Sequence, residues 1–284
     1  MTDVPTRIHY ENPSPAVARI VLAKPETRNA QDSTMLYEID AAFQRAAADD
    51  HIKVVILAAE GPHFSSGHDL RNPWHIGAQA PVSMWGGFDQ PGCEGLLAAE
   101  EEIFLGLCWR WRNFPKPTIA EVQGRAIAGV LMLVWSCDLI VATTDARFSD
   151  PVVALGVNGH EFFVHAWELG ARRAKEMLFT GGDVSAEEAR QLGMVNHVVE
   201  LDELPGFTLA LAERIARMPS LGLKLAKQSV NQSLDAQGQW TAVQAAFSLH
   251  QIGHAHNMKL FGQLIDPSGP ETIRELTRTP ARGR

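Results

Sequence analysis

Apolar runs that alternate with polar or glycine-containing turns divide the first two thirds of the chain into short segments. Residues 17–22 and 54–58 are almost entirely apolar, which is typical of strands in a sheet that helices cover on both faces. Between them, residues 33–48 carry apolar side chains at helical spacing, at Leu36, Ile39, Phe43 and Ala46. The pattern predicts a strand, a helix and a second strand.

The same alternation continues further along the chain. We expect helices at about 96–113 and 129–136, and strands at 118–122, 139–142 and 146–148. Repeated strand, turn and helix imply an α/β fold with a mainly parallel sheet.

From Glu161 onward the pattern is helical. Ser185 and Glu188 form a capping box that begins a helix ending at Gly193. Later helices are expected at 203–218, 220–235 and 240–257. We therefore divide the chain into an α/β core, residues 1–200, and a helical C-terminal region, residues 201–284.

Composition narrows the class of protein. The 284 residues include 45% hydrophobic residues and have a net charge of −8, which argues against a nucleic-acid-binding or membrane-surface protein. Three cysteines without CxxC spacing fit a reducing compartment. The first residues lack an apolar signal segment, and the longest apolar run, 126–135, is far shorter than the ~20 residues that span a bilayer. We expect a cytoplasmic protein.

Two glycine-containing turns carry the candidate chemistry. Residues 64–69 follow one strand, and residues 124–129 lie between the next strand and an apolar helix. Glycine permits close backbone approach to a ligand, and the first N–H groups of a helix have no internal partner. Two such turns can direct two N–H donors at one oxygen, which stabilises the negative charge that develops on a thioester carbonyl.

With these residues the chain resembles the crotonase (enoyl-CoA hydratase/isomerase) superfamily. The resemblance extends from about residue 8 to 235. It rests on 24–30, 64–70, 117–124, Gly129, 137–142, and 179–196.

The resemblance implies a crotonase-like spiral of ββα units, with coenzyme A bound as part of a thioester substrate and no permanently bound cofactor. It implies a homotrimer or a dimer of trimers, with the C-terminal region in trimerisation or pocket covering. It places the oxyanion hole at the N–H groups of His68 and Gly129. It also places CoA contacts at Lys24, Arg28, Ala30, Ser66 and Asp69.

The chain departs from the family's hydratase pattern at two positions. The resemblance places the two water-activating glutamates at residues 132 and 152, which are Met132 and Val152 here. Neither side chain transfers protons, so the two-glutamate mechanism does not carry over.

Two carboxylates are candidates for the replacement. Glu161 is our first choice of catalytic base, because we expect its apolar neighbours Phe162, Phe163 and Trp167 to raise its pKa. The alternative is that Glu161 begins a helix. Asp150 is the second candidate, and its alternative is a turn or cap carboxylate before Pro151.

We expect no metal site. His160 and His165 are five residues apart, which places them about 140° apart around a helix. His250 and His254 have helical spacing, but no carboxylate or cysteine is spaced along the sequence to join them, and a packed or interface helix is favoured.

Three functions remain open. The first is an enoyl-CoA hydratase/isomerase-like enzyme with a non-standard base, and the second is a non-catalytic acyl-CoA-binding paralogue. The third is a decarboxylase, because Gly67-His68-Asp69 resembles the form found in a methylmalonyl-CoA decarboxylase of the superfamily. In the long loop 71–95, Trp74, Trp85 and Phe88 either cover the acyl end or anchor the loop.

Overall fold

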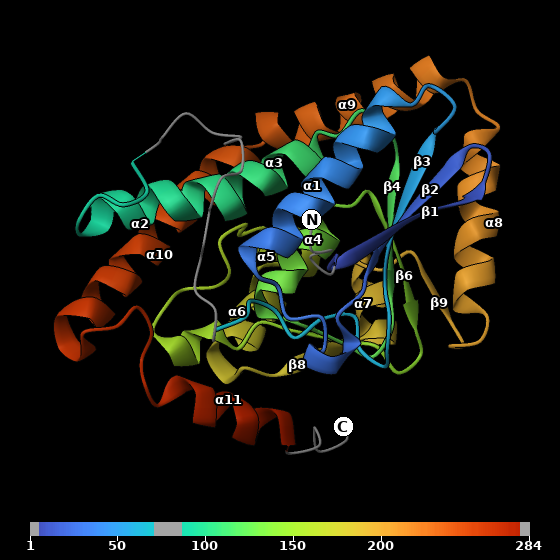
Figure 1. Ribbon diagram of the computed structural model, residues 1–284. Coiled ribbons are helices and arrows are strands. Elements are labelled where there is room, and N and C mark those ends of the chain that lie inside the picture. The colour runs from blue at the N-terminus through green and yellow to red at the C-terminus, as the bar shows by residue number, and fades with distance from the viewer. Residues whose placement is uncertain (1–5, 71–86, 279–284) are drawn as a thin grey trace.

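A six-stranded sheet forms the centre of the structure, a computed structural model that describes residues 6–70 and 87–278 (Figure 1). Its order is β1-β2-β3-β4-β6-β9. Only β1 runs antiparallel to its neighbour among these described strands. The strands are β1 (Ile8–Ser14), β2 (Val17–Leu22), β3 (Val54–Ala59), β4 (Thr118–Val122), β6 (Leu139–Thr143) and β9 (His197–Val199).

Helices cover both faces of this sheet. The remaining bounds are α1 (Ser33–Ala48), α2 (Cys93–Glu100), α3 (Leu107–Arg112), α4 (Leu131–Trp135), α5 (His165–Leu169), α6 (Ala171–Thr180), α7 (Ala186–Leu192), α8 (Leu204–Ala216), α9 (Ser220–Ala236), α10 (Gln239–Phe261) and α11 (Gly269–Arg278). In Figure 1, α8 lies on one side of the sheet and α1 on the other. This arrangement explains why the predicted strands are almost entirely apolar, because strands between two helical layers have no exposed face.

The side chains of β3 alternate between the two layers. Val54 and Ile56 belong to the apolar cluster that contains α8, whereas Val55 and Leu57 belong to the cluster that contains α1. Because α8 packs on the sheet, the helical C-terminal region shares a core with the strands.

A second, smaller sheet carries the turn before α4. Its order is β5-β7-β8, from β5 (Arg125–Ile127), β7 (Arg147–Ser149) and β8 (Asp183–Ser185). A 3-10 turn over Ala128–Val130 joins β5 to α4. The α/β class that the sequence predicted is confirmed.

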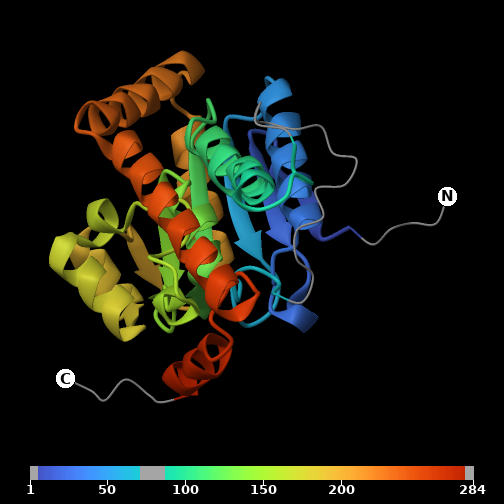
Figure 2. The same ribbon diagram turned by 90° about the vertical axis from the view of Figure 1, so that its left-hand side faces the viewer.

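The helices α2 and α3 are joined by a π-helical stretch, Glu101–Gly106, so residues 93–112 form one continuous helical rod. Figure 2 shows α10 crossing the molecule close to this rod, with α11 below it. The inward face of α10 buries Phe247, His250, His254 and Asn257. The π-helical stretch is of interest because such stretches occur frequently at functional sites.

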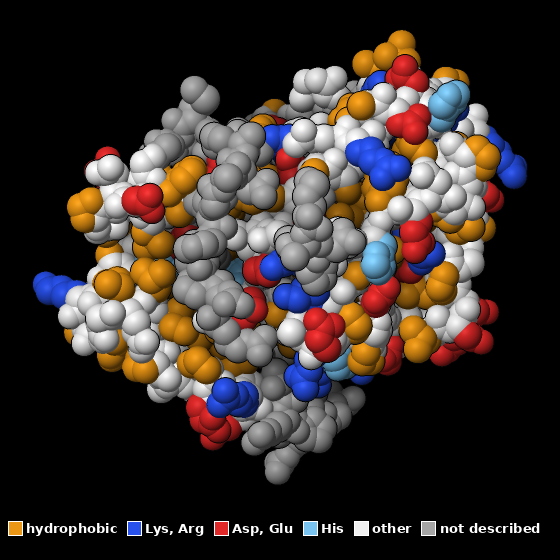
Figure 3. Space-filling view, viewed as in Figure 1, with side chains coloured by type: hydrophobic (Ala, Val, Ile, Leu, Met, Phe, Trp, Pro, Cys, Tyr) orange, Lys and Arg blue, Asp and Glu red, His pale blue; other side chains and the backbone are white. Residues whose placement is uncertain are grey.

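Several predicted segments differ in the structure. Strands β1, β8 and β9 and helix α11 were not predicted, and residues 125–127 of the expected turn form strand β5. The helical region begins at His165 rather than Glu161, which lies in a bend. No helix of the described ranges is both long and apolar enough to cross a membrane. On the face in Figure 3, described acidic and basic side chains are interspersed rather than gathered into a single-sign patch.

Candidate active site

The two glycine-containing turns lie side by side. Residues 64–65 run along residues 123–127: the Phe64 N–H donates to Gln123 O at 2.9 Å, and the Ser65 N–H donates to Arg125 O at 3.1 Å. The Ile127 N–H in turn donates to Ser65 O at 3.2 Å. This short ladder brings the residues that follow, Gly67 and His68, next to Gly129.

Contacts around the glycines show how closely the turns pack. A Cβ placed on Gly67 would lie 2.6 Å from Ile127 O and 3.4 Å from Gly129 N. A Cβ on Gly129 would lie 2.2 Å from Nε2 of His68. Ala128, in the second turn, has φ +54°, a left-handed conformation that is costly for a residue with a side chain. A side chain at residue 67 would strike the Ile127 carbonyl oxygen, and one at residue 129 would displace the His68 ring, so both positions favour glycine.

A cavity of about 50 Å³ lies beside these turns. Its walls include His68, Gly129, Val152, Glu161, His250 and His254. A larger cavity of about 450 Å³ lies between α9 and the end of α4, and it is lined mainly by apolar side chains together with the Lys227–Asp138 ion pair. None of the two-turn residues borders the larger cavity, so we place the candidate site at the smaller one.

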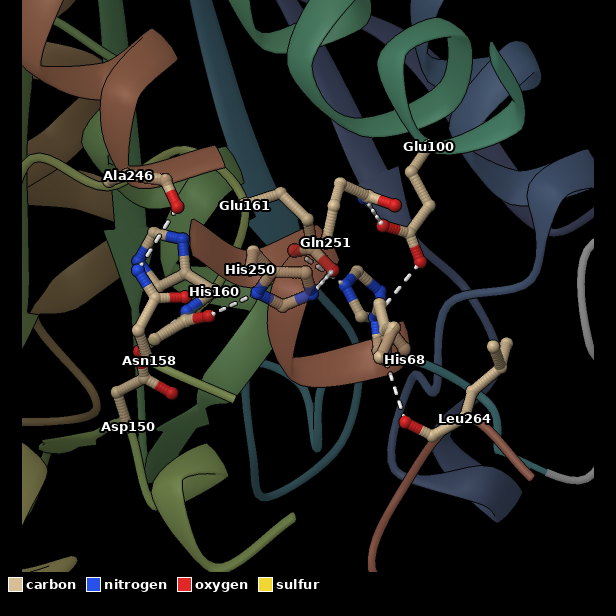
Figure 4. A network of polar contacts seen from close by, with 12 residues as sticks. His68, Glu100, Asp150, Asn158, His160, Glu161, Ala246, His250, Gln251 and Leu264 are labelled. Atoms are coloured by element: carbon tan, nitrogen blue, oxygen red, sulfur yellow. Dashed lines mark hydrogen bonds and ion pairs between the residues drawn. The ribbon is translucent and has the colours of Figure 1, made fainter. Parts of the chain in front are cut away.

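Glu161 projects into the site and faces two imidazoles (Figure 4). Its Oε2 lies 3.3 Å from His68 Nε2, and its Oε1 lies 3.6 Å from His250 Nε2. Burial acts to raise the pKa of Glu161, but the charge and hydrogen bond of His68 and the charge of His250 outweigh it. The pKa of Glu161 therefore lies below its ordinary range, and the carboxylate is ionised.

Two sequence-based expectations for Glu161 are therefore wrong. We expected apolar neighbours to raise its pKa, whereas histidines from two distant segments lower it. The alternative that Glu161 begins a helix also fails, because α5 begins four residues later.

Asp150, the second candidate base, lies deeper in the protein. It is fully buried, accepts a hydrogen bond from the His160 N–H at 2.9 Å, and lies 2.8 Å from His165 Nε2. It does not border the cavity among the described lining residues. This position fits the alternative hypothesis, in which Asp150 is a structural carboxylate in a turn.

His160 and His165 approach each other although they do not share a helix. Their ring centroids are 4.6 Å apart, so the helical angle used to separate them does not apply. Burial, and then the neighbouring His165, lower the pKa of His160 to about 3. His160 is therefore neutral at physiological pH.

The residues predicted to contact CoA lie in two adjoining loops. The Ser66 N–H donates to Arg28 O at 3.0 Å, and the Asp69 N–H donates to Gln31 O at 2.8 Å. Arg28 is exposed, Ala30 and Asp69 are buried, and Lys24 lies 3.5 Å from Asp32 Oδ2. The structure thus brings Arg28, Ala30, Ser66 and Asp69 together beside the first glycine turn.

Met132 and Val152 occupy apolar surroundings. Met132 is fully buried in the main core. Val152 borders the cavity and packs with Leu155 and Val157. Glu161 is the carboxylate that borders the cavity among its described lining residues.

The sequence did not predict the contribution of Glu100. This residue is 1% exposed, and its Oε1 lies 3.1 Å from His254 Nε2. The expectation that no carboxylate joins His250 and His254 is therefore wrong, because Glu100 reaches them from α2. Of the aromatic residues in the long loop, Phe88 packs against the core. Trp74 and Trp85 lie outside the described residues.

Known proteins resemble this chain over most of its length. The family model for enoyl-CoA hydratase/isomerase matches residues 12–91 and 95–263. A Mycobacterium tuberculosis protein, EchA13, named provisionally as an enoyl-CoA hydratase, is 44% identical over 84% of this chain and 78% of its own.

Two solved structures share the fold. A probable enoyl-CoA hydratase from Mycobacterium smegmatis has a TM-score of 0.84 and 46% identity, over 92% of this chain and 100% of its own. An enoyl-CoA hydratase/isomerase from Xanthobacter autotrophicus has a TM-score of 0.77 and 32% identity, over 97% and 99%. The chain belongs to the enoyl-CoA hydratase/isomerase family, the crotonase superfamily that its motifs predicted.

Proposed function

We propose that this protein is an acyl-CoA enzyme, hydratase- or isomerase-like, that stabilises a thioester enolate with the N–H groups of His68 and Gly129. The observation that carries the proposal is the close packing of the two glycine turns. A Cβ placed on Gly67 would lie only 3.4 Å from Gly129 N. Two preorganised donors at a developing oxyanion act without reorganisation during the reaction. Loss of one donor typically costs about 10²–10³ in rate.

The substrate in this proposal is an acyl-CoA thioester, with no permanently bound cofactor. The adjoining loops that carry Lys24, Arg28, Ala30, Ser66 and Asp69 hold the CoA portion. The assembly is a homotrimer or dimer of trimers in the cytoplasm, and the C-terminal region forms the subunit contacts and covers the pocket. Support for pocket covering comes from α10, whose His250 and His254 line the cavity.

Glu161 is the acid–base residue in this proposal. Its carboxylate borders the same cavity as His68 and Gly129, whereas Met132 and Val152 have no proton to transfer. Asp150 is not our choice, because its Oδ2 is already shared between His160 and His165.

The test is turnover on enoyl-, hydroxyacyl- and malonyl-type CoA thioesters, measured for the wild type and for Glu161→Gln. We expect the variant to lose roughly 10²–10⁴-fold in kcat, the usual contribution of a general acid or base. Glu168→Gln is the matched control, because Glu168 borders the larger cavity instead. Full activity of Glu161→Gln would refute the assignment of the base.

A second candidate is a non-catalytic acyl-CoA-binding protein, which the apolar residues at positions 132 and 152 favour. It predicts acyl-CoA binding by calorimetry with no turnover on the whole panel. Release of carbon dioxide from a malonyl-type thioester alone would instead identify a decarboxylase. A protein with no affinity for any CoA thioester would exclude all three functions.

A further inference from the structure

A buried carboxylate and two buried imidazoles meet at one wall of the candidate site. Glu100 comes from α2, and His250 and His254 lie one turn apart on α10. Their exposed fractions are 1%, 4% and 5%, and one ligand atom from each lies within 4.8 Å of the others. Figure 4 shows Glu100 reaching toward α10, with His250 and Glu161 beside each other.

The two imidazoles are oriented by backbone carbonyls. His250 Nδ1 lies 2.8 Å from Gly159 O, and His254 Nδ1 lies 2.7 Å from Leu264 O. A carbonyl oxygen only accepts hydrogen bonds, so each Nδ1 carries the proton. In the neutral imidazole the lone pair is then on Nε2, the atom that faces Glu100 and the cavity. This is the arrangement by which metal-binding histidines are held, with the far nitrogen donating to a carbonyl or carboxylate.

The carboxylate is oriented in a similar way. Gln251 Nε2 donates to Glu100 Oε2, which leaves Oε1 directed at the histidines. Oε1 lies 3.1 Å from His254 Nε2, whereas His250 Nε2 lies 3.6 Å from Glu161 Oε1 and has no hydrogen-bond partner within the described ranges. A buried polar atom without a hydrogen-bond partner is costly, so His250 Nε2 requires an explanation.

The packing of α10 fixes these side chains in place. A Cβ on Gly253 would lie 2.7 Å from Gly156 O, so only glycine lets the helix approach the loop that carries Gly159 and Glu161. Asn257 Nδ2 also donates to Leu155 O at 2.9 Å and to Leu264 O at 3.0 Å. The backbone that orients the histidines is thus held by the helix that carries them.

We propose that Glu100, His250 and His254 bind a divalent transition-metal ion, with zinc as the first candidate. Two nitrogens and one carboxylate oxygen are a ligand set that zinc takes in catalytic sites, where a further position stays open. Ligands about 2.0–2.2 Å from one tetrahedral or octahedral ion lie roughly 3–3.5 Å apart. The separation of 3.1 Å between Glu100 Oε1 and His254 Nε2 fits that range. This proposal revises our expectation of no metal, and it does not depend on the proposed function.

A second group of one carboxylate and two imidazoles is not proposed to bind an ion. Asp150, His160 and His165 also lie within 4.8 Å of one another. There, however, the Nδ1 atoms of His160 and His165 have no carbonyl to orient them within the described ranges, and Asp150 Oδ2 is engaged by the His160 N–H and by His165 Nε2. The alternative for Glu100 is a plain ion pair with a protonated His254, and the experiment separates the two.

The experiment is calorimetric titration of the full chain, without an affinity tag and after chelator treatment and dialysis, with zinc chloride. Cobalt(II) serves as a parallel probe, because its visible absorption reports nitrogen and oxygen ligation. We expect one ion per chain, with a melting temperature that rises as the ion concentration increases. Glu100→Gln and His254→Gln should each weaken binding by more than about 100-fold, beyond the effect typical of second-sphere changes. His256→Ala is the matched control, because His256 is exposed on the same helix, and it should bind as the wild type does.

Two results would overturn the proposal: a wild type that takes up neither ion in stoichiometric amount, or ligand variants that bind as the wild type does. If a ligand variant fails to fold, anomalous diffraction at the zinc edge from wild-type crystals decides the case. An ion located between Glu100 and the two histidines supports the proposal, whereas an ion bound only elsewhere excludes it. Because the readout is binding, its failure leaves the turnover test of Glu161→Gln unaffected.

Discussion

Gly129→Ala tests the contact at the centre of the site. The added methyl carbon would lie 2.2, 2.3 and 2.6 Å from three atoms of the His68 ring. Non-bonded carbon contacts are normally about 3.5–4.0 Å, so the ring must move by more than about 1 Å. That movement is restricted, because the centroids of the His68 and Phe104 rings are 4.3 Å apart. On the other side, His68 Nε2 lies 3.3 Å from Glu161 Oε2.

We expect two effects of Gly129→Ala. Forcing an extra carbon into a packed site typically costs about 1–3 kcal/mol, which urea unfolding measures directly. Displacing the Gly129 N–H should lower turnover by roughly 10²–10³-fold on whichever thioester the panel identifies. Gly222→Ala in α9 is the control, because a Cβ there meets nothing within 4 Å. Alanine in a helix should change stability by no more than about 1 kcal/mol, in the favourable direction.

A double-mutant cycle isolates the His68 contact from other effects of the methyl group. His68→Ala removes the ring that the new methyl group would strike. The double variant should therefore lose less stability than the two single variants added together. If the energies simply add, or if Gly129→Ala is as stable and active as the wild type, the His68 ring does not pack on Gly129.

Two further predictions concern stability. His160 has a folded pKa of about 3, below its unfolded value of about 6.5, so the unfolded chain binds more protons between these values. This group should therefore remove about 2 kcal/mol of stability as the pH falls from 7 to 5, and urea titrations of His160→Phe should lack that component. Arg112 Nη2 contacts Asp235 Oδ1 at 2.9 Å and Gln239 Oε1 at 2.8 Å. Arg112→Met should lower the free energy of unfolding, measured with urea, by about 2–3 kcal/mol. A loss below about 0.5 kcal/mol would contradict a stabilising role for the Arg112 contacts.

The sequence predicted the elements whose pattern is set by burial. The strand 118–122 and the helix 33–48 appear with the expected bounds, because their apolar spacing directly reflects the layers around them. The Ser185 cap is also confirmed, with its Oγ accepting from the Glu188 N–H. Strand β1 was missed because it is an edge strand whose residues are largely exposed and include Pro13, which leaves little apolar signal.

The surroundings of the candidate base were not predictable in the same way. His68 and His250 are distant from Glu161 in sequence, and only the fold places their rings against its carboxylate. Apolar neighbours in sequence, such as Phe162, suggested the opposite pKa shift. Glu100 was not predicted, because helical spacing identifies the buried face of α10 but not the residues that pack against it.

The backbone donors and the acid–base side chains of the candidate site are constrained differently. Family membership therefore predicts the backbone donors better than it predicts the acid–base side chains. The oxyanion hole that we propose, built from peptide N–H groups, needs only glycines at the close contacts and one strained residue, Ala128, in the second turn. Under this proposal the hole tolerates replacement of the acid–base side chains around it, such as by Met132 and Val152. In the proposed function, the thioester chemistry follows from the backbone, whereas the choice of reaction depends on the carboxylate and imidazoles of α10 and of the loop at Glu161. Variants at those side chains, rather than at the glycines, should decide which reaction occurs.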